Sequence, residues 1–271
     1  MPLTVLSIIF AFLILLLFWL YIYPAILQII AVSATKKGRY DRAVYWISQV
    51  LQRSPRNAIA WYIRGLLFQK MNQFEKAIFD LSRSFELAPN RLEILHCRAL
   101  IFMELQQFDE ALNDLNWIIS NQLNPSNALL TRSAVYIQKR EYQKAEDDCN
   151  QILEQDPDSA GAVCNRGLAR FRDGRLDEAI ADFHLTLLLN PQLTTAVVHL
   201  AHCWLEKGNI DHSLQLCNQV IVKNNNFGPA YYIRSLVWKK MGNPDNAKND
   251  QLLAEQYGYQ NDFIKDEDFK L

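Results

Sequence analysis

Residues 58–91 read AIAWYIRGLLFQKMNQFEKAIFDLSRSFELAPNR, and this stretch decides the fold. It contains two amphipathic helical patterns, one over 58–71 and the other over 74–87. Small residues stand where the two helices must approach closely, and Pro89 stops the second helix because its nitrogen cannot donate the next hydrogen bond. The stretch is therefore expected to form a helical hairpin.

The pattern of this hairpin recurs along the chain every 34 residues. One small-residue position is occupied by Ala43, Ala77, Ala111, Ala145, Ala179, Ser213 and Ala247. A proline position is occupied by Pro55, Pro89, Pro157 and Pro191, whereas Pro125 is displaced by two residues. A period of this length is typical of a solenoid, in which each unit buries its apolar face only against its neighbours.

The repeat resembles the tetratricopeptide repeat (TPR) family. Trp61, Gly65, Phe68, Phe74, Ala77 and Pro89 stand at the characteristic spacings of that family. The resemblance covers about 34–259 and includes six units, at 58–91, 92–125, 126–159, 160–193, 194–227 and 228–259. It implies an all-α solenoid of antiparallel helix pairs. Ser213, Asn225 and Gln251 depart from the family pattern, and the last unit is expected to be the least stable.

The N-terminal end differs in composition from the repeats. Residues 1–35 contain no charged side chain, and 3–23 are almost wholly apolar. At about 1.5 Å per residue a helix over 3–23 spans roughly 32 Å, which is enough for the hydrocarbon core of a bilayer. We therefore expect a transmembrane anchor at 1–23, which contacts the lipid bilayer through 3–23.

Two alternatives concern this end of the chain. A cleaved signal peptide is disfavoured because no Lys or Arg precedes the apolar run, which is also longer than a signal h-region. A partial N-terminal repeat is expected at 24–57, where Gly38, Tyr40 and Ala43 fall in register; a frayed connector is the alternative.

The distribution of charge predicts the topology. The chain has 28 Lys+Arg against 29 Asp+Glu, and this balance argues against nucleic-acid binding. Segment 36–56 carries six basic residues and one acidic residue, a net of +5, whereas 57–271 sums to −6. The positive-inside rule then predicts a single-pass protein with its N-terminus outside and its TPR domain in the cytoplasm. Five cysteines without a C-x-x-C pattern fit the reduced thiols of that compartment. The acidic tail, 260–271, is expected to be a frayed end; a recognition peptide is the alternative.

A second periodic pattern predicts structural ion pairs inside the units. Arginine occupies one repeat position and aspartate another, sixteen residues later, as Arg64 and Asp80, Arg98 and Asp114, Arg132 and Asp148, Arg166 and Asp182, and Arg234 and Asp250. The unit at 194 has Leu200 and Leu216 there, so the two charges are present together or absent together. The alternative is an anion-binding row of arginines. A leucine pair can replace a buried ion pair but cannot bind an anion, so we favour the structural interpretation.

The TPR resemblance places two positions of each first helix on the concave face of the solenoid. The predicted protein-binding groove consists of Tyr62, Leu66, His96, Leu100, Leu130, Leu168, Val198, His202, Tyr232 and Leu236. The stripe is mostly apolar, and exposed apolar patches mark contact sites.

The sequence shows no P-loop, nucleophile elbow, dinucleotide fingerprint or H-E-x-x-H motif. His199 and His202, with Cys203 adjacent, are the nearest approach to a metal site. No third fixed ligand follows from the spacing, and we interpret both histidines as surface or groove residues. We therefore expect no enzyme activity, no metal, no cofactor and no small-molecule substrate.

These features together predict a membrane-anchored protein-interaction scaffold, which docks partner proteins in the groove during the assembly of a membrane complex. The alternative is a receptor for chaperone or cargo peptide tails at the membrane. TPR proteins of that kind clamp a terminal carboxylate with Lys, Arg and Asn side chains. Only Asn165 stands at a matching position, so the resemblance to that group is weak.

Overall fold

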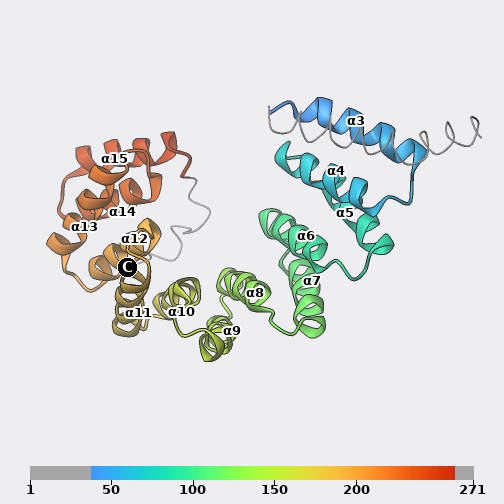
Figure 1. The fold of residues 1–271 in the computed structure, drawn as a ribbon. Helices are drawn as coiled ribbons and strands as arrows, with labels where there is room; N and C mark the ends of the chain where they lie inside the picture. Colours follow the sequence, from blue (N-terminus) through green and yellow to red (C-terminus); the bar gives the residue numbers. More distant parts are fainter. Residues whose placement is uncertain (1–37, 260–271) are drawn as a thin grey trace, which may run out of the picture. The chain divides into compact units, whose positions relative to one another are not determined.

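The computed structural model describes residues 38–259, which form thirteen α-helices and no strand (Figure 1). The helices are α3 (Tyr40–Arg53), α4 (Ala58–Lys70), α5 (Phe74–Leu87), α6 (Leu92–Glu104), α7 (Phe108–Asn121), α8 (Ser126–Gln138), α9 (Tyr142–Gln155), α10 (Ala160–Arg172), α11 (Leu176–Leu189), α12 (Thr194–Glu206), α13 (Ile210–Lys223), α14 (Gly228–Lys240) and α15 (Pro244–Gln256). Six antiparallel pairs start at 58, 92, 126, 160, 194 and 228, where the sequence places the starts of the units.

We call the first helix of each pair an inner helix and the second an outer helix; α3 has the sequence register of an outer helix, with Ala43 at the position of Ala77, and is counted with them. The outer helices are strongly amphipathic where the pattern is clearest, as in α5, which buries Ala77, Asp80, Leu81 and Ser84. Gly65 lies on the facing side of α4, and a Cβ atom at this position would come within 2.9 Å of Leu81 Cγ. Only a glycine therefore allows α4 and α5 to pack at this distance without a shift of Leu81.

The turn inside each pair requires a residue in the left-handed region. Gly174, Gly208 and Gly242 supply it with φ near +80°, +80° and +71°, and Asn72, Gln106 and Arg140 adopt it at +54°, +57° and +60°. These six positions share the period of 34, but only the glycines adopt this conformation without a steric penalty. The repeat thus tolerates a small local strain in three of its turns.

The described helices belong to two compact units, which divide between Ala128 and Leu129. The first of these compact units contains α3 to α7, and the second contains α9 to α15 with most of α8. Below, the first unit and the second unit always mean these two parts, whereas a repeat is identified by the residue at which it starts. In the first unit, Ile47 and Val50 of α3 pack in one cluster with Ala60 and Leu67 of α4. In the second unit, Phe183 of α11 packs with Leu200 of α12.

No helix between residues 38 and 259 is both long enough and apolar enough to cross a membrane. The predicted anchor at 3–23, the first helix of the partial repeat at 24–37 and the acidic tail at 260–271 all lie outside the described residues. The described helix α3 lies where the second helix of that partial repeat is predicted.

Candidate functional site

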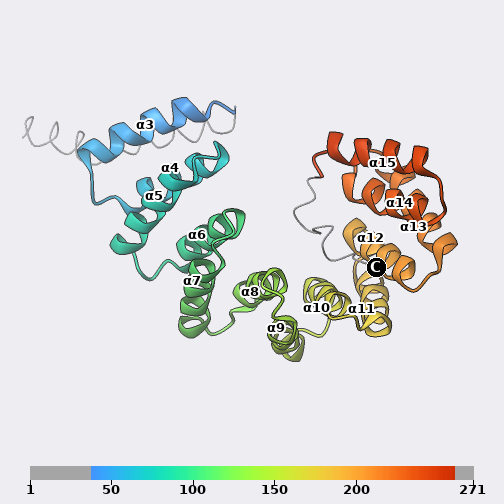
Figure 2. The same ribbon diagram turned by 180° about the vertical axis from the view of Figure 1, so that it is seen from behind.

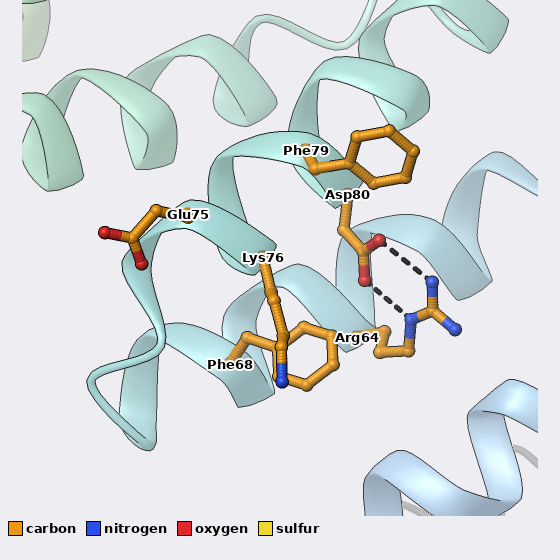
Figure 3. Close-up of a pocket in the computed structure, with 6 residues that line it drawn as sticks. All are labelled: Arg64, Phe68, Glu75, Lys76, Phe79 and Asp80. Carbon is orange, nitrogen blue, oxygen red and sulfur yellow. Dashed lines mark hydrogen bonds and ion pairs between the residues drawn. The ribbon is translucent and has the colours of Figure 1, made fainter.

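The five periodic arginines each form two hydrogen bonds with the aspartate sixteen residues later. Arg64 donates from Nε and Nη2 to the two carboxylate oxygens of Asp80, at 2.6 and 2.9 Å (Figure 3). Arg132 donates to Asp148 in the same way, at 2.9 and 2.6 Å. The equivalent bonds join Arg98 to Asp114, Arg166 to Asp182 and Arg234 to Asp250. Each of these ion pairs joins the inner helix of a repeat to the outer helix of the same repeat.

Arginines of this row also reach the preceding outer helix, which the sequence analysis missed. Arg64 Nη1 donates to Ser48 Oγ of α3 at 3.1 Å. The equivalent bonds run from Arg98 to Ser82, from Arg166 to Asn150 and from Arg234 to Asn218. The acceptors share the 34-residue period, so the signal was present in the sequence. One guanidinium therefore joins three helices, which supports a structural role for the arginine row.

In the repeat that starts at 194, apolar side chains occupy the two positions of the ion pair. Leu200 is buried beside Phe183, and Leu216 packs against the same cluster. An apolar contact therefore takes the place of the ion pair in this unit.

The second unit has a further buried charge network that the sequence analysis did not identify. Glu146 of α9 accepts hydrogen bonds from Arg170 of α10, at 2.5 and 2.9 Å, and from Arg175, at 2.5 Å. Arg170 also donates to Asp182 at 2.9 Å. Burial alone would raise the pKa of Glu146, but the hydrogen bonds from Arg175 and Arg170 lower it. The carboxylate is therefore ionised inside the protein.

We call the predicted groove positions of α4 and α6, which are Tyr62, Leu66, His96 and Leu100, the inner face of the first unit. This face is partly accessible to solvent. Leu100 of α6 is 39 % exposed, and Tyr62, Leu66 and His96 are half-buried. The Tyr62 hydroxyl lies 3.6 Å from Cys97 Sγ, and the Arg91 guanidinium lies 5.4 Å from the Tyr62 ring. Burial lowers the pKa of His96, so its imidazole is neutral at pH 7. This face presents a largely apolar surface, bordered by Arg91 in an ion pair with the exposed Glu93.

The inner positions of the second unit are much less accessible, and this corrects the predicted groove. Val198, His202 and Tyr232 are at most 5 % exposed. Val198 and Tyr232 belong to one buried cluster, where the Tyr232 ring lies 4.9 Å from that of Tyr259. Leu168 and Leu236 are half-buried and pack against buried neighbours. These inner helices pack closely together, so Val198, His202 and Tyr232 do not line an accessible groove.

The two histidines of α12 also lie elsewhere than predicted. The His202 ring lies 4.7 Å from that of Phe171, and the His199 ring stacks on Phe183 at 5.4 Å. Burial lowers the pKa of His199 to about 4 and that of His202 to about 3. Both are neutral packing residues rather than surface residues. Within 38–259, no group of three His, Cys, Asp or Glu side chains is arranged to hold a metal ion.

Asn165 and the cysteines also have internal surroundings. The Asn165 amide donates to the Leu130 carbonyl at 3.2 Å and to Ser133 Oγ at 2.9 Å. All five cysteines, which lie in the described range, are free thiols. Burial raises the pKa of Cys149, Cys203 and Cys217 to about 12, so these thiols are protonated and unreactive at pH 7.

A shallow open hollow lies between α4 and α5 in the first unit. Its lining residues are Arg64, Phe68, Glu75, Lys76, Phe79 and Asp80 (Figure 3). Arg64 and Asp80 pair with each other here, and Lys76 Nζ donates to Gln73 Oε1 at 2.9 Å. Three of the four charged side chains in its wall are therefore already bound, which does not favour a small-molecule site.

Comparisons with known proteins agree with this architecture. A family model described as Tetratricopeptide repeat matches residues 98–160 and 134–192, and one described as Anaphase-promoting complex, cyclosome, subunit 3 matches residues 36–118. No curated protein matches the chain by sequence.

Several solved structures share the fold at low sequence identity. A tetratricopeptide repeat protein from Parabacteroides merdae is 21 % identical with a TM-score of 0.82, over 90 % of this chain and 96 % of that one. PilW, described as a widely conserved type IV pilus biogenesis factor, is 17 % identical with a TM-score of 0.64, over 73 % and 92 %. A chain of the APC/C hetero-tetramer Cut9-Hcn1 is 16 % identical with a TM-score of 0.67, over 84 % and 45 %. At these identities the likeness shows the fold alone.

Proposed function

We propose, because the chain is a tetratricopeptide repeat protein, that it is a membrane-anchored scaffold that docks partner proteins during the assembly of a membrane complex. TPR repeats imply a protein–protein interaction scaffold, and the membrane and the complex are the further steps of the proposal. The apolar segment 3–23 and the basic segment 36–56 after it support the anchor. PilW, a pilus biogenesis factor of the same fold, gives a precedent for a role in assembly.

One observation supports the proposed position of the docking site. The inner face of α4 and α6 leaves Leu100 exposed beside the half-buried Tyr62 and His96, whereas the equivalent positions of α12 and α14 are largely closed. An exposed apolar side chain next to aromatic rings, with arginine at its edge, has the composition of an interface core. We therefore place the docking site on the first unit, around Tyr62, Leu66, His96 and Leu100.

The receptor for peptide tails is less well supported. Asn165 was its only polar candidate, and its amide is already bound to Leu130 and Ser133. A carboxylate clamp needs several free donors in one place, whereas Arg91, at the border of the inner face of the first unit, already donates to Glu93 at 2.7 Å.

Leu100→Glu should reduce the capture of partner proteins from solubilised membranes by about tenfold or more, because it puts an unpaired carboxylate into an apolar contact. Val222 is an exposed apolar residue of α13 and provides a matched control. Val222→Glu should leave capture unchanged, and binding to the wild type should depend little on salt. If a folded Leu100→Glu protein recovers the same partners in full, the docking site lies elsewhere.

The proposed topology predicts the outcome of a protease experiment. Protease added to sealed cells or right-side-out vesicles should leave residues 36–271 intact, because the positive-inside rule places them in the cytoplasm. Permeabilised samples serve as the control and should be digested. Digestion of the repeats in sealed samples would contradict this topology.

A further inference from the structure

Two outer helices of the first unit repeat a pattern of exposed residues that later units lack. Arg42 and Tyr45 lie on one exposed face of α3, and Lys76 and Phe79 occupy the same repeat positions on α5. Tyr45 is 57 % exposed and Phe79 is 64 % exposed. The positions equivalent to these aromatic residues are filled by Asn113, Asp147, Ala181, Gln215 and Asn249. The pattern of a cation followed three residues later by an aromatic ring is confined to α3 and α5.

The two patterns lie on neighbouring helices. Arg64 of α4 donates both to Ser48 of α3 and to Asp80 of α5, so it holds these two outer helices on either side of one guanidinium. Ser48 is one turn after Tyr45, and Asp80 directly follows Phe79. The labelled helices α3, α4 and α5 lie together in both views (Figures 1 and 2).

Aromatic contacts connect this surface with the core beneath it. The Tyr45 ring meets that of Trp46 edge-on at 5.0 Å, and the Phe79 ring meets that of Trp61 at 6.1 Å. Trp46 and Trp61 both pack against the cluster that contains Ile47 and Val50. The two exposed rings are therefore fixed to the scaffold by the indoles beneath them, while much of each ring remains in solvent.

The charge of this region is opposite to that of the rest of the described chain. Residues 38–91 contain nine Lys and Arg against four Asp and Glu, a net of +5. Residues 92–259 contain 15 against 21, a net of −6. The acidic residues Asp41 and Glu75 lie next to the pattern, so the positive potential comes from the region as a whole.

We propose that the surface formed by Arg42, Tyr45, Lys76 and Phe79 is a second membrane contact, which lays α3 and α5 against an anionic lipid surface. A tyrosine ring favours the headgroup level of a bilayer, an exposed phenylalanine ring inserts at the boundary between headgroups and acyl chains, and basic side chains are attracted to anionic lipid. The inference goes beyond the docking function, and it uses the proposed anchor only to bring the repeats to the bilayer. Because the docking site uses inner helices, a partner and the membrane would use different surfaces of the first unit.

The chain contains its own control for a test of this contact. Lys76 and Lys144 occupy the same position in two repeats that are two periods apart, and both are exposed. The full chain is reconstituted in vesicles of phosphatidylcholine alone or of phosphatidylcholine with phosphatidylglycerol. An amine-reactive reagent then labels both lysines, and mass spectrometry gives the ratio of their rates. The orientation of the protein in the vesicle affects both lysines equally and cancels in the ratio.

The expected result is that phosphatidylglycerol slows the labelling of Lys76 relative to Lys144 by about fivefold, and that high salt restores it. Tyr45→Asn with Phe79→Asn should remove most of this protection, since asparagine occupies the position in two other units. Val222→Asn is the matched control for loss of an exposed apolar side chain and should change nothing.

Three outcomes would overturn the proposal. The first is that phosphatidylglycerol leaves the ratio of the two labelling rates unchanged. The second is that neutral vesicles protect Lys76 as much as anionic ones do. The third is that Lys76 is protected in detergent, to an extent that increases with protein concentration. The last would show that a second copy of the chain covers the surface. Flotation of the protein with neutral vesicles tests the anchor separately, so failure of the anchor and failure of this contact can be told apart.

Discussion

Arg132→Leu is expected to lower the free energy of unfolding by about 3–5 kcal/mol, because it leaves a buried carboxylate without its main partner. The side chain of Asp148 is only 5 % exposed, and Arg132 donates two of its hydrogen bonds. Asp148→Leu should cost less, since the Arg132 side chain is 18 % exposed and its guanidinium can recruit water. Urea unfolding followed by circular dichroism measures both changes.

The double variant should be far less harmful than Arg132→Leu alone. Pairing with Asp148 raises the pKa of Arg132, whereas burial raises that of Asp148. The first shift reflects the formed ion pair, in which Arg132 donates two hydrogen bonds to the carboxylate. The second reflects the desolvation that the pair must overcome, and two leucines avoid this cost. The unit at 194 already packs Leu200 and Leu216 in this way.

A double-mutant cycle isolates the interaction between the two charges. If the two single changes are additive to within about 0.5 kcal/mol, Arg132 and Asp148 are not coupled and the structural interpretation is wrong. Lys144→Leu is the control, because Lys144 pairs with Glu141 on the surface, where an ion pair is screened by water. It should have no measurable effect on unfolding.

The second large effect is expected at Arg170. Arg170→Phe should destabilise the protein by about 1.5–3 kcal/mol, because Glu146 keeps only the hydrogen bond from Arg175. Phenylalanine itself fits the repeat, where the equivalent residues are Phe68, Phe102, Tyr136, Trp204 and Trp238. The loss of stability should therefore come from the incompletely paired carboxylate of Glu146 rather than from poor packing of the new side chain.

Two further measurements test this explanation. Glu146→Ile, added to Arg170→Phe, should restore most of the stability, since isoleucine occupies this position in two other units. The pKa of Glu146 is lowered in the wild type, so its contribution is present above the unfolded carboxyl value of about 4.3 and is lost as the pH falls through the folded value. The deficit of Arg170→Phe should accordingly shrink in acid. A deficit that is the same at all pH values would indicate a packing defect instead.

The period of 34 residues predicts the helices well because it reflects local requirements. Each hairpin needs a close approach at Gly65 or its equivalents and a stop such as Pro89, and both are visible in one sequence. The Arg–Asp pairs were visible for the same reason, since both partners belong to one hairpin. Ser48 and its equivalents were equally periodic, but they act across the boundary between two units.

The accessibility of the inner face could not be read from the period. Whether Tyr62 is open and Tyr232 closed depends on how tightly successive hairpins pack and on contacts beyond the repeat, such as the one from Tyr259. Residues at one repeat position therefore have different exposures. The Glu146 and Arg170 network was visible as two departures from the pattern: an acid at a position that is aliphatic in every other repeat except the last, which has Lys248, and an arginine among aromatic residues. It could have been found by comparing such departures with one another.

The central claim is that a partner protein docks on the inner face of the first unit while the chain is held at a membrane. A photoreactive leucine analogue at position 100 of the full-length protein, activated in its native membrane, tests it most directly. Position 222 is the control, because Val222 is more exposed but lies outside the proposed site. We predict a discrete crosslinked protein from position 100, none from position 222, and loss of the product when residues 1–34 are removed. Crosslinking at neither position, or equally at both, would contradict the account.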